Sequence, residues 1–345
     1  MERLLEGDHG PDKYRARFPT DAEDSDSGIT PWQLFVKWVA ERQPAEGTVE
    51  SWRYPFRELA GHFGDDRSAA SITVEEADAW VKSLITSERS AGTVKKTWLN
   101  ACNTVFRWGV EHKHIPRNPF QGTKVTVPKK KKLREPSLRP EEIRTILLAA
   151  SAIPNTRNAV DDAAKRWVPW LCAYSGARPG EMTQLREIDV IERQHIHAIR
   201  ITPEAGTVKS GEAREVPLHQ HLIDQGFLEF VAQSKDGPLF YLPDKAGPNG
   251  GDPVKRKKPR YAQARQRVAE WVRSLGVDDP NISPNHAWRH TFKRIADRAG
   301  ISERTSDYIT GHARKSVGAG YGPPTLEDMA EALKKFPRYE IDTSA

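Results

Sequence analysis

Cysteine is scarce in this chain of 345 residues, which has only Cys102 and Cys172. Both lie in apolar, helix-like surroundings, which favours buried free thiols in a reducing compartment, and neither has the paired spacing of a zinc site. Apolar runs near the ~20 residues of a membrane span are also missing, and the N-terminus lacks the apolar core of a signal peptide. We therefore expect a cytoplasmic protein.

The sequence also contains neither a phosphate-binding P-loop nor an acidic cluster suited to metal ions. What it does contain is a net charge of +6, although its first 28 residues are rich in acids. Two basic runs stand out: Lys129, Lys130, Lys131 and Lys132, and Lys255, Arg256, Lys257 and Lys258. Such runs attract a polyphosphate backbone without reading its sequence, and the alternative for each is a solvated linker or surface loop.

Hydrophobic periodicity predicts the organisation of the first part of the chain. Residues 1–28 have none and are expected to be disordered or loosely attached. Residues 29–119 predict a small bundle of four helices, which begin at Thr30-Pro31, near Thr48, at the capping box Thr73–Glu76 and at Ser90. A basic linker, residues 120–136, follows them.

The second part, residues 137–324, predicts a mostly helical domain with a few strands. Strand-like stretches at 195–202 and 212–219 flank a turn that contains Lys209. Helices are predicted at about 163–174, 262–275, 286–299 and 302–309, and residues 325–345 form an amphipathic helix with a tail. The predicted fold class is mainly α with a small antiparallel β-sheet, in two domains.

Residues suited to phosphodiester chemistry gather near the C-terminus. His286 and Arg289 are three positions apart and therefore share one helix face, and His312 and Tyr321 from a following segment could converge on them. Tyrosine is a covalent nucleophile, and fixed cations can hold the charge of a transferring phosphoryl group. Taken singly, each of these residues is more typical of a structural role.

Two further residues would complete such a site. Arg178 offers a planar fork for two phosphate oxygens, and Glu181, three positions on, could orient it. Lys209 could donate a proton to a leaving oxygen from its turn. A surface ion pair and an ordinary turn lysine are the alternatives.

In combination, these segments resemble the tyrosine recombinase (phage integrase) family over roughly residues 30–330. Ser175-Gly-Ala-Arg178-Pro-Gly-Glu181 is similar to the family's first arginine box, and Lys209, ahead of Val216-Pro217-Leu218, is similar to its hairpin lysine. His286-Ala-Trp-Arg289-His290 resembles the second box. Thr310-Gly311-His312 resembles the third, and Tyr321 falls at the position of the nucleophile.

The resemblance implies a helical core-binding (SAM-like) domain and a catalytic domain that together form a clamp on DNA. It implies that Tyr321 attacks a DNA phosphodiester to give a 3′-phosphotyrosyl bond, without metal, ATP or another cofactor. Arg178 and Arg289 would hold the non-bridging oxygens with help from His312, and Lys209 would protonate the 5′ oxygen. His286 would act as proton acceptor or phosphate ligand, with Glu181 and His290 in support.

The implied partner is double-stranded DNA, in the nucleoid, with four protomers on two duplexes and with accessory DNA-bending or directionality proteins. Lys95, Lys96 and Arg107, together with the lysine run 129–132, are the expected DNA contacts. The C-terminal helix could dock on a neighbouring protomer or pack back on its own domain. A topoisomerase-like nicking–closing enzyme and a DNA-binding relative that no longer cuts are the rival functions.

The chain departs from the family pattern at several positions. Trp288 and Thr310 stand where leucine is usual, and Gly318 and Gly320 predict a looser segment before the tyrosine. His290 and Tyr308 are nearby competitors for the nucleophile's position, and the spacing favours Tyr321. The segment 1–28 is too short and too acidic to resemble a separate arm-binding domain.

Overall fold

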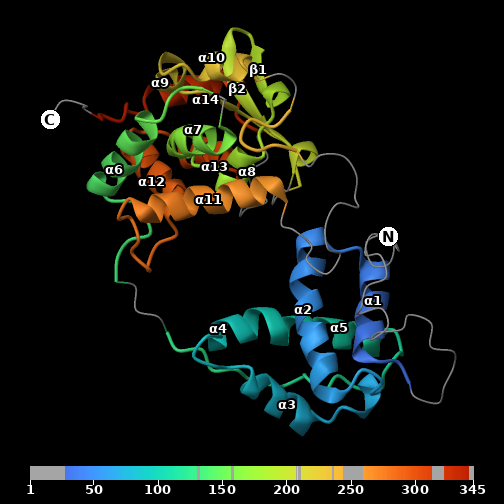
Figure 1. The fold of residues 1–345 in the computed structure, drawn as a ribbon. Coiled ribbons are helices and arrows are strands. Elements are labelled where there is room, and N and C mark those ends of the chain that lie inside the picture. Colours follow the sequence, from blue (N-terminus) through green and yellow to red (C-terminus); the bar gives the residue numbers. More distant parts are fainter. Residues whose placement is uncertain are drawn as a thin grey trace. The chain divides into compact units, whose positions relative to one another are not determined.

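The computed structural model describes residues 28–129, 133–156, 159–206, 208, 211–234, 237–243, 259–312 and 322–341. The chain divides into two compact units between residues 129 and 133 (Figure 1). Lys130, Lys131, Lys132, Lys209, Tyr321 and the basic run 255–258 lie outside the described residues.

The first unit is entirely helical in its described part. Its elements are α1 (Pro31–Arg42), α2 (Glu46–Phe63), a 3₁₀ turn η2 (Ala69–Ser71), α3 (Val74–Ser83), α4 (Ala91–Thr93), a π-helical segment η3 (Val94–Leu99) and α5 (Asn100–Glu111). Thr30 and Thr73 both cap their helices, as the sequence predicts. The capping box of Thr73 with Glu76 is the predicted one, and that of Thr30 with Gln33 appears only in the structure. The helix predicted from Ser90 is present as the α4–η3–α5 run.

Phenylalanines fill the core of this bundle. Phe35 and Phe56 stack with ring centroids 4.7 Å apart, and Phe106 meets Phe120 edge-on at 4.9 Å. Phe120 and Val125 are both buried in this core. The first part of the predicted linker 120–136 therefore packs as part of the bundle.

The second unit combines helices with one small sheet. Its helices are α6 (Pro140–Ser151), α7 (Val160–Ser175), α8 (Pro179–Thr183), α9 (Gln220–Asp224), α10 (Phe227–Ala232), α11 (Arg260–Ser274), α12 (Pro284–Arg298), α13 (Glu303–Thr310) and α14 (Leu326–Lys334), with 3₁₀ turns η4 (Glu187–Asp189) and η5 (Pro203–Ala205). The antiparallel sheet has the order β1 (Val190–Arg193), β2 (Ile196–Ile201), β3 (Arg214–Pro217). The predicted class, mainly α with a small antiparallel sheet, is confirmed.

The sequence reading missed β1, α9 and α10. β1 is joined to β2 through Gln194 and His195, which both have positive φ angles, 50° and 63°. A tight hairpin of this kind usually carries Asn-Gly or Asp-Gly, so this pair gave no turn signal. α9 and α10 are only five and six residues long, too short to show a helical period.

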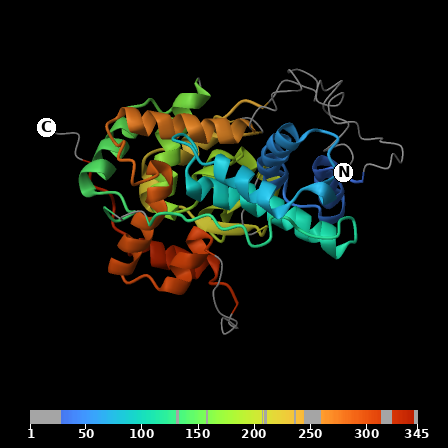
Figure 2. The same ribbon diagram turned by 90° about the horizontal axis from the view of Figure 1, so that it is seen from below.

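Helix α7 runs through the middle of the second unit and is buried on nearly all sides (Figures 1 and 2). It packs against α6, α11 and α12, and its largest buried side chains are Trp167, Trp170 and Tyr174. A helix that is apolar all round is one that the core encloses. The C-terminal end of α7 is therefore held rigidly, and the first arginine box follows directly from it.

Helix α14 packs against its own unit in this structure. Met329, Leu333 and Phe336 are each 2% exposed, and Phe336 stacks on Phe292 of α12 with centroids 4.9 Å apart. Beyond the helix, the Tyr339 hydroxyl donates to the Ala173 carbonyl of α7 (3.2 Å). Trp288, the bulky substitute for the family's leucine, meets the Tyr339 ring edge-on.

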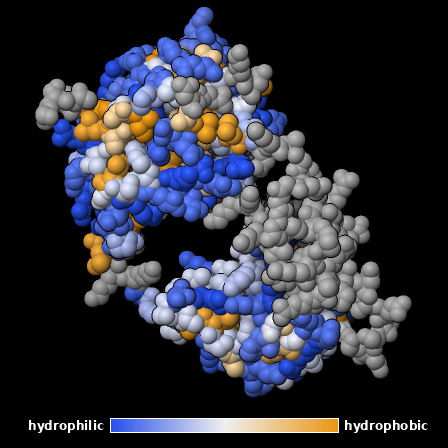
Figure 3. All heavy atoms as spheres, in the orientation of Figure 1, coloured by the Kyte–Doolittle hydropathy of each residue, from blue (hydrophilic) through white to orange (hydrophobic). Residues whose placement is uncertain are grey.

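The surface is mainly polar. Figure 3 shows hydrophilic side chains over most of the visible described surface of both units, with small scattered apolar areas. Among the described residues, no helix combines the length and apolar character needed to cross a membrane.

Arg134 anchors the start of the second unit. Its guanidinium is 6% exposed and binds Glu142 of α6 (2.7 and 2.8 Å) and Asp279 (3.1 Å), while it also donates to the Ser137 carbonyl. The bonds from Arg134 lower the pKa of Glu142. Bonds from Asn281, and then from Arg134, lower the pKa of Asp279 to about 2. Both carboxylates are thus charged at neutral pH and depend on one cation.

We expect Arg134→Ala to lower the free energy of unfolding of the second unit by about 3 kcal/mol, because Glu142, whose side chain is 13% exposed, loses the cation that holds it. Arg193→Ala, which breaks the more exposed ion pair with Glu215 (3.0 Å), should cost less than about 1 kcal/mol. Urea denaturation of both variants measures the difference. Equal losses would contradict the anchoring role of Arg134.

Candidate active site

The first arginine box lies where α7 ends. Gly176 closes α7 in the left-handed region (φ 56°), and a Cβ there would come within 2.7 Å of Thr310 and 2.9 Å of Phe292. Only glycine permits this close approach between α7, α12 and α13. Two residues later, Arg178 caps α8, and its backbone N–H donates to Glu181 (3.0 Å).

Glu181 lies between two arginines. It is 1% exposed and accepts from Arg178 Nη1 through Oε1 (2.8 Å) and from Arg214 Nη2 through Oε2 (2.7 Å). Burial by itself would raise the pKa of Glu181, but the charges and hydrogen bonds of Arg214 and Arg178 outweigh it and leave that pKa lowered. The carboxylate therefore stays charged and fixes both guanidinium groups.

The second arginine box supplies a third guanidinium to the same place. Arg289, on α12, is 3% exposed and donates from Nη1 to the Gly176 carbonyl (3.1 Å) and to the Thr310 carbonyl. Its Nε donates to His312 Nε2 (3.1 Å). Burial, then repulsion from Arg178, lowers the pKa of Arg289 to about 10, so it is charged at neutral pH.

The three arginines share the C-terminal end of α13. Arg178 Nη2 donates to the Gly311 carbonyl (3.2 Å), and Arg214 donates to the carbonyls of Ile309 (3.4 Å) and Thr310 (3.3 Å). The last carbonyls of a helix lack partners within the helix and carry partial negative charge, so they are natural acceptors for cations.

His312 follows directly and is held by its neighbours. Its Nδ1 lies 2.8 Å from the Thr310 hydroxyl and 3.6 Å from Asp307, which binds Lys293 of α12 (2.7 Å). Burial first, then the charge of Arg289, lowers the pKa of His312 to about 4. The imidazole is therefore neutral at neutral pH.

Two nitrogen atoms of this cluster are buried without a hydrogen-bond partner among the described residues: Arg289 Nη2 and Arg214 Nη1. Buried donors of a charged group are rarely left unpaired, because the desolvation is costly. Three guanidinium groups balanced by one buried carboxylate have an excess of positive charge. The arrangement suits a bound anion with several oxygens, such as a phosphate group.

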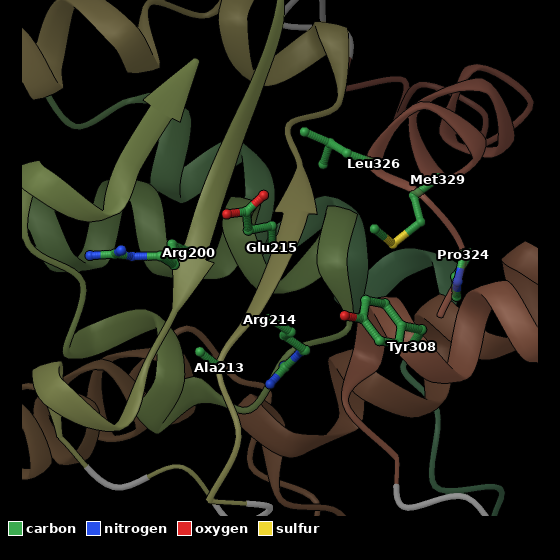
Figure 4. A pocket seen from close by; sticks show the side chains of 8 residues that line it. All are labelled: Arg200, Ala213, Arg214, Glu215, Tyr308, Pro324, Leu326 and Met329. Atoms are coloured by element: carbon green, nitrogen blue, oxygen red, sulfur yellow. The ribbon is translucent and has the colours of Figure 1, made fainter. Parts of the chain in front are cut away.

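A hollow of about 260 Å³ borders the cluster on the side of the sheet (Figure 4). Arg214 and Glu215, adjacent on β3, point away from each other, and Tyr308 of α13 and Met329 of α14 form the facing wall. Tyr308 is half-buried against the core. It is a wall residue of this hollow.

Of the predicted site residues, the structure brings together Arg178, Glu181, Arg289 and His312. His286 lies on α12 one turn before Arg289 and is exposed, with its ring edge-on to His290 at 5.7 Å. Burial, then Arg289, lowers the pKa of His290. Lys209 and Tyr321 are outside the described residues.

Arg214 is a site residue that the sequence reading missed. It belongs to no recognised box, and the only sequence signal is an arginine at the start of a strand that precedes Val216-Pro217. Its burial (7% exposed) and its bond to Glu181 appear only once β3 meets α8 and α13.

The expected DNA contacts of the first unit are on its surface. Lys95 and Lys96 in η3 and Lys129 are exposed. Arg107 on α5 is 68% exposed and lies 3.9 Å from Glu111. Lys130, Lys131 and Lys132 are not among the described residues.

Comparisons with known proteins bear on the fold. No family model matches the chain. The structure of a lambda integrase tetramer bound to a Holliday junction is similar with a TM-score of 0.59 and 16% identity, over 89% of this chain and 82% of that one. The Tn1549 transposon integrase, in complex with circular intermediate DNA, gives 0.57 and 16%, over 89% and 99%. The chain therefore has the fold of the tyrosine recombinases, and the resemblance drawn from its motifs is confirmed at that level.

A curated relative is similar in sequence. The "Putative defective protein IntQ" of Escherichia coli (strain K12) is 26% identical over 197 residues, which are 51% of this chain and 46% of that protein. The chain thus matches about half the length of this relative.

A pair of glycines tests the packing around α13. Gly311 (φ 70°) and Gly300 (φ 71°) share one left-handed conformation, but a Cβ on Gly311 would lie 2.5 Å from the Arg214 guanidinium carbon, and one on Gly300 would meet nothing within 4 Å. We expect Gly300→Ala to cost about 1–2 kcal/mol of stability from backbone strain alone. Gly311→Ala should cost about 1–3 kcal/mol more, because Arg214 must move.

Urea denaturation of the two variants gives both numbers. Because the backbone strain is matched, their difference reports the contact with Arg214. Equal losses would show that Arg214 is not held against Gly311.

Proposed function

We propose that the protein is a site-specific DNA recombinase that cuts and rejoins DNA strands through a covalent 3′-phosphotyrosyl intermediate. The observation that carries the proposal is the cluster of Arg178, Arg289 and Arg214 around the end of α13, with Arg289 Nη2 buried and unpartnered among the described residues. A scissile phosphate placed there would accept hydrogen bonds from guanidinium groups that are already oriented.

The chemistry is a transfer between oxygens at phosphorus. The phenol oxygen of Tyr321 attacks the phosphodiester, the bond to the 5′ oxygen breaks, and Lys209 gives that oxygen a proton. The phenol proton passes to a base, for which His286 is the assigned group. A 5′-hydroxyl then reverses the step. The roles of Tyr321, Lys209 and His286 rest on their spacing in the sequence and on the shared fold.

The proposed partner is double-stranded DNA held between a core-binding domain (29–119) and a catalytic domain (137–324). Within the linker 120–136, the lysine run 129–132 would lie along the backbone, and a C-terminal helix and tail (325–345) completes the chain. Exposed Lys95, Lys96, Arg107 and Lys129 supply phosphate contacts in this scheme. A homotetramer on two duplexes is proposed because the similar lambda integrase is a tetramer on a Holliday junction. Accessory bending or directionality proteins would add to that assembly.

A covalent-trapping experiment tests the proposal. DNA fragments from either side of the gene are incubated with the protein in EDTA. Each fragment carries a nick beside the tested cleavage position, so that the short strand released by cleavage diffuses away and cannot rejoin. We expect a protein–DNA adduct on a denaturing gel with wild type and none with Tyr321→Phe. The matched control is Tyr308→Phe, which loses the neighbouring phenol on α13 and should still form the adduct.

Each other outcome has a definite meaning. Adduct formation by Tyr321→Phe overturns the assignment of the nucleophile. On a supercoiled plasmid that carries the same DNA, relaxed circles without recombinants identify a topoisomerase-like enzyme. DNA binding without any adduct from wild type identifies a DNA-binding relative that does not cut.

The salt dependence of DNA binding tests the first unit. We expect the double variant Lys95→Ala/Lys96→Ala to weaken binding and to lower the slope of log affinity against log salt by roughly 1–2, because about 0.9 is lost per phosphate contact. Lys82→Ala, on α3 and paired with Asp78 in the same unit, is the control and should leave the slope unchanged. Fluorescence anisotropy at several salt concentrations measures both.

A further inference from the structure

His312 is bonded at both ring nitrogens, and the chemistry of its partners fixes which one carries the proton. Arginine has only donors, so the bond from Arg289 Nε requires a lone pair on His312 Nε2. The neutral ring must then carry its hydrogen on Nδ1. The Thr310 hydroxyl, 2.8 Å away, is the acceptor for it.

The direction of the Thr310 bond follows from a second contact. A threonine hydroxyl has one hydrogen, and that of Thr310 points to the Ser306 carbonyl (2.7 Å) one turn back on α13. Its lone pairs are therefore left for His312 Nδ1–H. A chain of directed bonds runs from Arg289 Nε to His312, on to the Thr310 hydroxyl and from there to the Ser306 carbonyl.

Asp307 does not replace Thr310 in this role. Its Oδ1 lies 3.6 Å from His312 Nδ1, beyond normal hydrogen-bond length, and it is paired with Lys293 at 2.7 Å. The charged groups that act on His312 are Arg289, Asp307, Lys293 and Arg178. Thr310 is fully buried and also supplies the carbonyl that Arg289 and Arg214 share.

We propose that Thr310 is a positioning residue: its hydroxyl holds His312 as the Nδ1–H tautomer, so that the ring accepts from Arg289 and fixes the plane of that guanidinium. Nη2 of Arg289, which has no partner among the described residues, is thereby kept in place for a phosphodiester oxygen. His312 then acts through Arg289 before DNA binds, as an acceptor. The effect on cleavage rests on the function proposed above, whereas the tautomer does not.

The first test is the tautomer itself, by ¹⁵N NMR of the full chain with labelled histidine, assigned with His312→Gln, without DNA. We expect wild type to show His312 protonated at Nδ1 alone and neutral down to a pH near 4. Thr310→Val keeps the shape and removes the acceptor, so only the bond from Arg289 still selects the Nδ1–H tautomer, and the Nε2–H form should appear beside it. Thr310→Ser should restore it.

Thr291→Val is the matched control. Thr291 is also fully buried on a helix. Its hydroxyl donates to the Ala287 carbonyl one turn back (3.0 Å) and accepts from the Leu138 backbone, so its bonds are separate from those that hold His312. This variant also loses a buried hydroxyl, so it reports what that loss does to stability when the bonds of His312 are left intact. Its His312 signals should match those of wild type.

The second test is the single-turnover rate of adduct formation. We expect Thr310→Val to be slower by about tenfold and Thr310→Ser to recover most of that loss. A wild-type ring protonated at Nε2, or a Thr310→Val protein with the wild-type tautomer and rate, overturns the proposal. If wild type forms no adduct, the proposed function fails while the NMR result still decides the role of Thr310.

Discussion

The site depends on the exposed carbonyl groups at the C-terminal end of α13. Three guanidinium groups, from the start of α8, from β3 and from α12, donate to the carbonyls of residues 309 to 311. Arginines repel one another in low dielectric, and a helix end with unpaired carbonyls and partial negative charge is one of the few protein groups that can hold several of them together. Glu181 adds the one full negative charge.

This arrangement leaves the cluster short of negative charge. Burial first, and then the neighbouring cations, lower the pKa values of Arg289 and His312, because both oppose a further positive charge. For His312 the folded pKa of about 4 is below the ordinary value of 6.5, so the unfolded chain binds the proton more readily between those values. The contribution of the neutral ring to stability is therefore complete above about pH 6.5 and is lost as the pH falls toward 4. A bound phosphate would supply the missing charge.

The sequence predicts those parts of the fold and the site in which a residue and its partner are close in the chain. Arg178 and Glu181 are three positions apart, so their spacing was enough to link them. The same spacing did not bring His286 to Arg289, because His286 lies on the exposed side of α12 and Arg289 is buried. Thr30 and Thr73 carried their own capping partners, and the helices begin there. The convergence of Arg289 with Gly176 and Thr310 is a tertiary fact, and a resemblance in motif order was needed to predict it.

Arg214 and Thr310 show where such reading stops. Arg214 gains its role from three elements that are distant in sequence, so no periodic pattern marks it. In the sequence, Thr310 stands out only as a departure from leucine. That comparison concerns the packing position and leaves out the hydroxyl. The hydroxyl becomes informative once its hydrogen is assigned to Ser306 and its lone pair to His312.

The buried arginine cluster distinguishes a protein that cuts DNA from one that only binds it. Exposed cations are enough for binding to DNA alone, and they cost little stability to maintain. A buried guanidinium with a donor unpaired among the described residues, beside two others, lowers stability and gains nothing for contact with a DNA surface. Selection for folding alone would replace it with apolar side chains. Its presence, together with a neutral histidine oriented to fix it, favours a site that stabilises charge developing on a phosphate during a reaction.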